Sequence, residues 1–224
     1  LRFPWQMTLG AIKNDQLVYE MGSEIARQCQ RLGVHINFAP VVDVNSNPKN
    51  PIINNRSFGE DPARVAILGK AYMQGLQDGG VLACAKHFPG HGDTDADSHK
   101  TLPIISHTKE HLDSIDLVPF QQMFQSGLGS IMVAHLYIPE LDNTENLAST
   151  LSPKIVSGLL KEEMGFEGLI FTDALNMKGV SNFYEPGEVD LKALLAGNDV
   201  LLFAEDVPKA IEKIKEAITN NQIS

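Results

Sequence analysis

Six histidine and aspartate side chains lie in one short segment of the sequence, between Lys86 and Pro103. Within fourteen residues the chain places three histidines and three aspartates: His87, His91, His99, Asp93, Asp95 and Asp97. The preceding apolar run Val81–Ala85 predicts a short buried strand that ends near Pro89-Gly90. Loops that follow strands on a rigid scaffold often carry binding and catalytic groups. This segment is therefore the first candidate for a functional site.

Metal binding is disfavoured for this segment. Asp93, Asp95 and Asp97 alternate as in a calcium loop, but Ser98 replaces the required glycine and Ile104 replaces the bidentate glutamate. That excludes an EF-hand.

A zinc site and an acid–base pair are the other chemical interpretations. His87 and His91 share a face only on a helix, and Pro89-Gly90 prevents one, which argues against zinc. Asp97 and His99 are two residues apart, so in an extended loop the carboxylate can orient the imidazole for proton transfer. A solvated polar loop without chemistry is the remaining alternative.

The motif Lys86-His87-Phe88-Pro89-Gly90-His91-Gly92, followed by Asp97-Ser98-His99, resembles the signature of the β-N-acetylglucosaminidases of glycoside hydrolase family 3. The resemblance extends over essentially the whole chain. It implies that Lys86 and His87 bind sugar hydroxyls, and that Asp97 and His99 form the general acid/base pair. His91 is expected to brace the loop.

Composition bounds the class of protein. The chain has 224 residues, 43% of them hydrophobic and 21% charged, which predicts one globular domain, residues 1–224, with a sizeable core. The net charge of −10 argues against nucleic acid or anionic membrane as a partner. No apolar run reaches the roughly 20 residues of a membrane span, and no signal-peptide pattern precedes Leu1. Cys29 and Cys84 are expected as small hydrophobic residues, and neither a cofactor nor a metal is expected.

Helical periodicity and continuous apolar runs alternate along the chain. Helices are predicted at residues 15–32, 62–77, 109–125, 152–164, 189–196 and 207–219, and strands at 34–44, 81–86, 130–135, 168–173 and 199–203. Continuous apolar strands are buried on both faces, which predicts a parallel sheet covered by helices, an α/β fold. Gly90-His91-Gly92 lacks the third glycine of a nucleotide fingerprint.

Polar residues end one predicted strand after another, as at Asp43, Lys86-His87, His135, Asp173 and Glu205. In a closed barrel all strand ends converge on one mouth, so a (β/α)8 TIM-type barrel is favoured over an open sheet. Five β-then-α units are fewer than eight. The resemblance implies two further strands upstream, the second carrying an aspartate that grips the sugar. The chain is therefore predicted to be an incomplete barrel, which associates with itself through an exposed edge or covers that edge with its own helices.

Asp173 is the predicted nucleophile, because it ends a buried strand and such hydrolases need a carboxylate opposite a proton donor. The alternative is that Asp173 caps the next helix or forms an ion pair with a lysine of the barrel. The resemblance implies a covalent glycosyl–aspartate intermediate, with net retention at the anomeric carbon. His99 would protonate the leaving oxygen and later deprotonate water, with Asp97 fixing its tautomer. Ala174 occupies a position that is often acidic in the family.

Further residues are predicted to bind substrate. The resemblance implies that Arg56 contacts the sugar. The alternative is that Arg56 forms a salt bridge with Glu60 or Asp61. Asp43 and His135 end strands and are named as binding residues, but Asp43 can instead hold Arg56 or Lys86, and His135 can instead be a supporting core group.

The predicted function is hydrolysis of terminal β-linked N-acetylglucosamine from glycans, with peptidoglycan fragments as the natural class by resemblance. One alternative is a family-3 β-glucosidase, although such enzymes typically lack the Asp97/His99 pair. Another is a catalytically silent carbohydrate-binding fragment. The resemblance favours the bacterial envelope as location, with the cytoplasm as the alternative.

Overall fold

The computed structural model describes residues 1–95 and 101–223, so Asp97 and His99 lie outside the described residues. The chain forms two compact units, residues 1–95 with 108–132 and residues 96–107 with 133–224. The helices and strands up to the division are α1 (Gln6–Gly10), α2 (Gln16–Arg31), β1 (Ile36–Asn37), η1 (Asn54–Arg56), α3 (Pro62–Asp78), β2 (Leu82–Phe88), α4 (Lys109–His111), η2 (Leu112–Asp116), α5 (Val118–Phe124) and β3 (Ser130–Val133). Those that follow are η3 (Ser149–Leu151), η4 (Lys154–Glu163), β4 (Leu169–Ala174), α6 (Lys178–Ser181), α7 (Glu188–Ala196), β5 (Val200–Leu202) and α8 (Val207–Thr219).

The strands are parallel and follow one another in chain order, and the division between the units falls inside β3. In the first unit β1 pairs with β2, with Ile36 opposite Leu82. In the second unit β4 pairs with β5, with Phe171 opposite Val200. The predicted parallel α/β class is confirmed. Five strands lie in the described residues, so the closed eight-stranded barrel stays a prediction.

Helix ends follow the capping chemistry of the sequence. Asp61 Oδ1 accepts a hydrogen bond from the Ala63 amide at 2.9 Å, and Pro62 starts α3, where its missing N–H costs nothing. Asp15 precedes α2 but forms no capping bond. Asn14 Oδ1 accepts from the Gln16 amide instead.

Proline residues explain two differences from the predicted elements. The strand expected over residues 34–44 is regular only over β1, because Pro40 cannot donate to the ladder. Pairing resumes at Val41, opposite Lys86. The helix expected over residues 109–125 is divided into α4, η2 and α5, with Pro119 in the first turn of α5.

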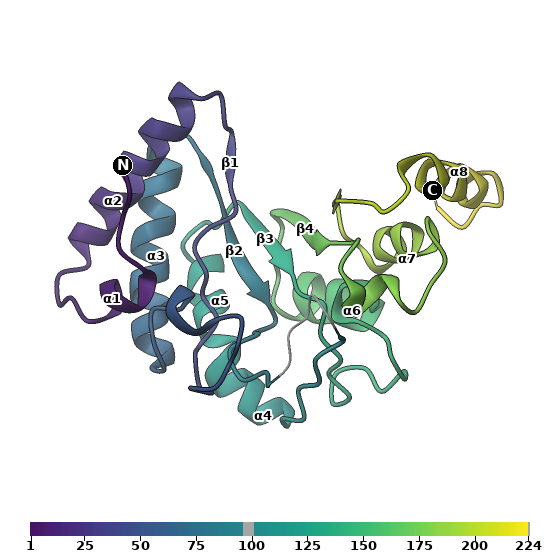
Figure 1. Ribbon diagram of the computed structural model, residues 1–224, viewed down its shortest axis with the longest axis horizontal. Coiled ribbons are helices and arrows are strands. Elements are labelled where there is room, and N and C mark those ends of the chain that lie inside the picture. Colours follow the sequence, from purple (N-terminus) through teal and green to yellow (C-terminus); the bar gives the residue numbers. More distant parts are fainter. Residues whose placement is uncertain (96–100, 224) are drawn as a thin grey trace. The chain divides into compact units, whose positions relative to one another are not determined.

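In the first unit α2 and α3 pack side by side (Figure 1). Two glycines allow this close approach. A Cβ atom on Gly22 would lie 2.6 Å from the Tyr72 carbonyl oxygen, and one on Gly75 would lie 2.1 Å from that of Tyr19. The two backbones are therefore in direct contact, and these helices form one wall beside β1 and β2.

In the second unit α7 packs against η3, β5 and α8. The hydrophobic cluster of this unit includes Leu151, Leu175, Val189 and Ala193, all buried. Burial of such side chains stabilises the unit by roughly 1.5–3 kcal/mol for each large aliphatic residue. This packing fixes β4, and with it the strand end that carries Asp173.

Candidate active site

The first unit holds a buried pair made by Asp43 and His87. His87 Nδ1 lies 2.7 Å from Asp43 Oδ2, and both side chains are almost completely buried. Asp43 Oδ1 accepts two further hydrogen bonds, from the backbone amides of His87 at 3.1 Å and His91 at 2.7 Å. The carboxylate therefore ties both ends of the His87–His91 turn to the segment that follows β1.

Burial alone raises the pKa of the Asp43 carboxyl, because a charge is costly away from water. The hydrogen bonds from the His87 side chain and from the amide of His91 outweigh that cost. The pKa of Asp43 consequently lies below its usual value, and the group is a carboxylate at neutral pH. Asp43 was predicted to bind substrate or to hold Arg56 or Lys86, whereas its carboxylate in fact holds His87 and the amide of His91.

Arg56 determines the tautomer of His87. Arg56 Nη2 lies 3.4 Å from His87 Nε2, while Nη1 donates to the Ile52 carbonyl at 3.2 Å. A guanidinium has donors only, so His87 Nε2 must accept and His87 Nδ1 must carry the proton that is donated to Asp43. Arg56 thus contacts His87. Lys86 occupies β2 directly before His87 and is half-buried.

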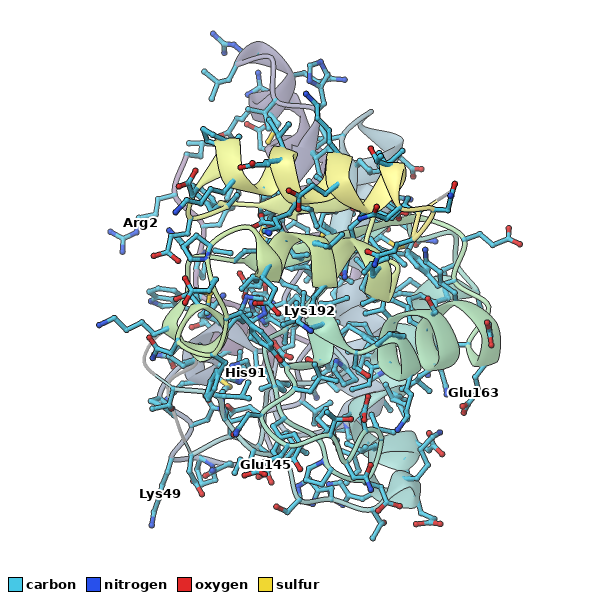
Figure 2. All side chains as sticks on the ribbon, turned by 90° about the vertical axis from the view of Figure 1, so that its right-hand side faces the viewer. Arg2, Lys49, His91, Glu145, Glu163 and Lys192 are labelled. Carbon is cyan, nitrogen blue, oxygen red and sulfur yellow. The ribbon has the colours of Figure 1, made fainter. Side chains whose placement is uncertain are left out.

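His91 is held by two residues that the sequence did not single out. Its Nδ1 lies 2.8 Å from Thr94 Oγ1, and Asn50 Nδ2 donates to the His91 carbonyl at 2.8 Å and to Thr94 Oγ1 at 3.2 Å. His91 is 2% exposed, whereas the nearby Lys49 side chain projects outward (Figure 2). The abundance of asparagine in residues 45–61 was the only sequence signal for this network.

Gly92 lets the motif lie directly against the chain after β1. A Cβ atom on Gly92 would lie 1.7 Å from the Val44 carbonyl oxygen. Asn47 Nδ2 also donates to Asp95 Oδ1 at 2.6 Å. Residues 91–95 are therefore anchored to residues 43–50.

In the second unit, Asp173 lies at the end of β4, as predicted, and is half-buried. Its Oδ1 accepts a hydrogen bond from the Ala174 amide at 2.8 Å. The neighbouring Thr172 accepts from the Leu202 amide at 2.9 Å, which ties β4 to β5. Because β4 is bonded to β5 in this way, the backbone that carries the Asp173 carboxylate is firmly positioned.

His135 follows β3 and is 1% exposed. Its Nδ1 lies 2.8 Å from Thr150 Oγ1 and its Nε2 lies 3.0 Å from the Ala174 carbonyl oxygen. Both ring nitrogens are engaged inside the protein, which favours the supporting role over direct sugar binding. Thr150 is a second residue that sequence patterns missed.

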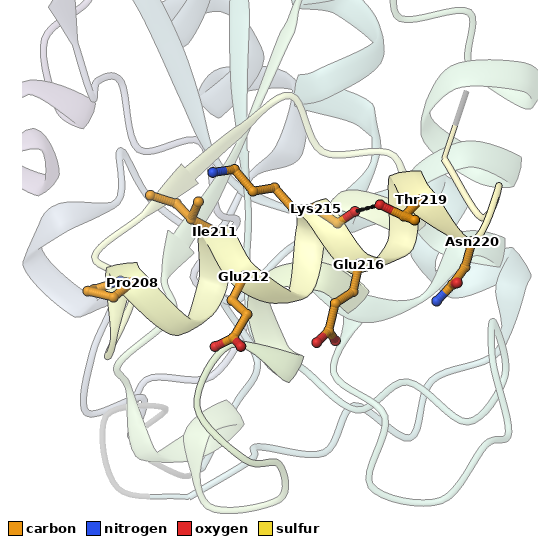
Figure 3. Close-up of a pocket in the computed structure, with 7 residues that line it drawn as sticks. All are labelled: Pro208, Ile211, Glu212, Lys215, Glu216, Thr219 and Asn220. Carbon is orange, nitrogen blue, oxygen red and sulfur yellow. Dashed lines mark hydrogen bonds between the residues drawn. The ribbon is translucent and has the colours of Figure 1, made fainter.

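The described residues show neither a metal centre nor a membrane-spanning helix. Across residues 1–95 and 101–223, no group of three or more His, Cys, Asp or Glu side chains is arranged to hold a metal ion. None of the helices in that part of the chain is long and apolar enough to cross a bilayer. A cavity of about 550 Å³ lies along α8, between residues such as Ile211, Lys215 and Thr219 (Figure 3), and none of the predicted site residues lines it.

A parallel α/β fold with polar residues at its strand ends is a scaffold that many enzymes share. The chain belongs to glycosyl hydrolase family 3, since it matches the N-terminal domain of that family over residues 1–224.

Among curated relatives, the chain is 41% identical over 213 residues to beta-hexosaminidase A of Pseudoalteromonas piscicida, covering 89% of this chain and 36% of the relative. It is 36% identical over 231 residues to the beta-hexosaminidase LpqI of Mycobacterium tuberculosis, covering 98% of this chain and 58% of that protein. The chain thus spans about a third to three fifths of the length of these relatives.

Solved structures give the same family. A glycoside hydrolase family 3 β-N-acetylglucosaminidase from Paenibacillus sp. FPU-7 superposes with a TM-score of 0.94 at 40% identity, covering 98% of this chain and 42% of the other. A protein described as beta-glucoside phosphorylase BglX also reaches 0.94, at 26% identity, covering 99% of this chain and 41% of the other.

Proposed function

We propose that the protein containing this chain is a retaining exo-glycosidase that releases terminal β-linked N-acetylglucosamine. The observation that carries the proposal is the similarity, over most of the chain, to proteins named beta-hexosaminidase. The position of Asp173 at the end of β4, with its carboxylate oriented by the Ala174 amide, supports a nucleophilic role.

The proposed mechanism has two steps. Asp173 attacks the anomeric carbon and forms a glycosyl–aspartate ester while His99 gives its proton to the departing glycosidic oxygen. Water then attacks the anomeric carbon, His99 takes the proton of that water, and the bond from the anomeric carbon to Asp173 breaks, which releases Asp173 as a carboxylate. Asp97 holds the His99 imidazole in the required tautomer. Two inversions give net retention.

Substrate binding is proposed for Arg56, Lys86 and His87. The hydrogen bonds with Asp43 and Arg56 hold the neutral His87 side chain in one tautomer and one orientation. Asp43 and His135 support their neighbours in this proposal. Peptidoglycan fragments are the proposed substrate class, because they carry β-linked N-acetylglucosamine.

The eight-stranded barrel is proposed for the complete protein, with residues 1–224 as part of its catalytic domain. Self-association of the isolated chain through a barrel edge belongs to the same proposal. Light scattering on the chain tests it, since a monodisperse monomer at all concentrations contradicts association.

A β-glucoside-active enzyme is the second candidate, supported by the similarity to the structure named beta-glucoside phosphorylase. The two candidates differ in the sugar that is accepted and in the acceptor that attacks the intermediate, water or phosphate.

Turnover of aryl β-N-acetylglucosaminide and aryl β-glucoside by the full-length protein tests the proposal, with and without phosphate. We expect strong preference for the N-acetylglucosaminide, and loss of most activity in Asp173→Ala and His99→Ala. Equal turnover of both sugars, or undiminished rates in both variants, contradicts the assignment. An NMR time course that shows the inverted anomer first contradicts the covalent step.

A further inference from the structure

Ala174 connects the candidate nucleophile to a buried histidine. The Ala174 amide donates to Asp173 Oδ1 at 2.8 Å. The carbonyl of the same residue accepts from His135 Nε2 at 3.0 Å and from the Met177 amide at 3.1 Å. The residue that orients the Asp173 carboxylate is therefore itself fixed, and His135 provides one of its two carbonyl partners.

The direction of the His135 hydrogen bond follows from chemistry. A backbone carbonyl only accepts, so His135 Nε2 must carry a proton. On the other side of the ring, Thr150 Oγ1 lies 2.8 Å from Nδ1, which fixes the orientation of the imidazole plane. With 1% of its surface exposed, His135 has no room to contact a sugar directly.

The support of His135 continues into η3. Ser149 Oγ lies 2.5 Å from the Ala134 carbonyl and accepts from the Leu136 amide at 3.1 Å, and the Ser149 amide donates to the Leu136 carbonyl at 2.7 Å. Thr150 Oγ1 also lies 2.5 Å from the Ala134 carbonyl. The residues on either side of His135 are thus joined to η3, and all of these polar groups are buried. Such a packed frame holds a side chain within a narrow range of positions.

We propose that His135 is a positioning residue for Asp173, acting through Ala174 and held in place by Thr150. The inference rests on the proposed function, because it assigns Asp173 the role of nucleophile. Without the imidazole, the Ala174 carbonyl loses one of its two partners in a partly buried site. The Ala174–Leu175 peptide, which carries that carbonyl, can then shift. Through the Ala174 Cα the shift displaces the preceding Asp173–Ala174 peptide, whose amide holds Asp173 Oδ1.

The predicted consequence is kinetic. A misplacement of a reacting group by about 1 Å costs roughly 100-fold in rate, while groups that bind the sugar are untouched. Loss of His135 should therefore lower kcat and leave KM nearly unchanged. A histidine that only stabilised the core would change the melting temperature and leave both kinetic constants of the folded enzyme unchanged.

The test uses the full-length protein with His135→Leu and His135→Gln. The glutamine Nε2 can reach the position of the imidazole Nε2, so it can still donate to Ala174, whereas leucine cannot. The rate of covalent labelling of Asp173 by a fluorinated N-acetylglucosaminyl inactivator reports nucleophilic attack alone. In His135→Leu we expect the labelling rate and kcat to fall about 10- to 100-fold, while KM stays within about threefold of wild type. Where the loss in His135→Leu exceeds tenfold, we expect His135→Gln to restore both rates by at least about tenfold.

Thr150→Val and Ser130→Ala form a matched pair. Each removes one buried hydroxyl that hydrogen-bonds to a carbonyl oxygen, but Ser130 contacts Ala83, in the first unit. We expect slower labelling in Thr150→Val only, and less than additive effects when it is combined with His135→Leu. A folded His135→Leu variant with wild-type labelling and kcat overturns the proposal, as does an equal loss in Ser130→Ala.

A substrate-independent measurement separates this proposal from the proposed function. Amide hydrogen exchange at Ala174 should be faster in His135→Leu and close to wild type in His135→Gln. If the wild type does not turn over N-acetylglucosaminides but exchange changes as expected, the proposed function fails and the link from His135 to Ala174 stands. Unchanged exchange at Ala174 in His135→Leu overturns the link itself.

Discussion

His87 Nδ1 lies 2.7 Å from Asp43 Oδ2, in a pair from which solvent is almost excluded. Arg56 Nη2, on the other side of the ring, is a donor, so the proton of the neutral imidazole is directed to Asp43. The family motif thus carries one defined tautomer, specified by residues 44 and 31 positions away in the sequence.

Asp43→Asn tests this arrangement. If the amide nitrogen faces His87 Nδ1, two donors oppose each other. If it faces the other way, it opposes the backbone amides of His87 and His91. We expect the free energy of unfolding to fall by about 2–3 kcal/mol and kcat/KM by roughly 100-fold. Urea denaturation and steady-state kinetics measure the two effects.

Asp61→Asn is the control for Asp43→Asn, because asparagine caps a helix about as well as aspartate and α3 should keep its stability. The pH dependence gives a second check. Because the pKa of Asp43 is depressed in the folded state, its stabilising contribution is present above the unfolded pKa of about 4 and is lost as pH falls through the folded value. A stability difference between wild type and Asp43→Asn that grows on acidification contradicts the assignment.

Asp190→Asn should stabilise the protein at neutral pH. Asp190 is 2% exposed, and within the described residues its Oδ1 has no hydrogen-bond partner. Burial raises the pKa of this carboxyl, and the negative charge of Glu205 raises it further. The charged form therefore destabilises the fold above the folded pKa. We expect Asp190→Asn to raise the free energy of unfolding by about 1 kcal/mol at pH 7.

The pH profile of Asp190→Asn has a defined sign. Its gain should disappear below about pH 4, where aspartate is protonated in both the folded and the unfolded chain. Asp142→Asn is the matched buried control with the opposite effect. Burial raises the pKa of Asp142, but hydrogen bonds from Ser152 and Thr144 outweigh it, so this carboxylate stabilises at neutral pH. Urea denaturation from pH 3 to 8 distinguishes the two, and a neutral-pH loss in Asp190→Asn refutes the interpretation.

Gly92→Ala should disrupt the site far more than a glycine-to-alanine substitution does at an uncrowded position. The added methyl group would lie 1.7 Å from the Val44 carbonyl oxygen, so the backbone of one segment has to move. We expect a loss of more than about 3 kcal/mol in stability, or loss of activity in the folded remainder. Thermal unfolding and kinetics measure these effects.

Gly158→Ala is the matched glycine substitution for this test. Its nearest neighbour would be 3.8 Å away, and Gly158 lies inside the helical segment η4, where alanine is favoured by up to about 1 kcal/mol. A melting temperature for Gly92→Ala equal to that of Gly158→Ala shows that the close approach at Val44 is absent.

Local sequence signals predicted the regular elements well. The helices α2, α3 and α8 carry clear periodicity, and β2 and β4 are continuous apolar runs. The irregular strand near β1 and the divided helix before β3 were not predicted, because Pro40 and Pro119 remove backbone donors at points that periodicity does not register.

The candidate site was predictable only in part. His87 and Asp173 were predicted as site residues from a motif and from a strand end, and these roles stay predictions. Asn50, Thr94 and Thr150 were not, because an amide or a hydroxyl gains its role from partners far along the chain. Asn50 contacts Thr94 across 44 positions, and Thr150 contacts His135 across 15. Such pairings are properties of the packed structure, and no local pattern contains them.

The contact between α2 and α3 limits how this protein can be engineered. Gly22 and Gly75 face backbone atoms of the opposite helix, so enlarging one position cannot be offset by trimming the other, which already has no side chain to remove. Libraries that seek new sugar preferences can therefore diversify the loops at the strand ends, while these two codons are best left constant whatever the chosen substrate.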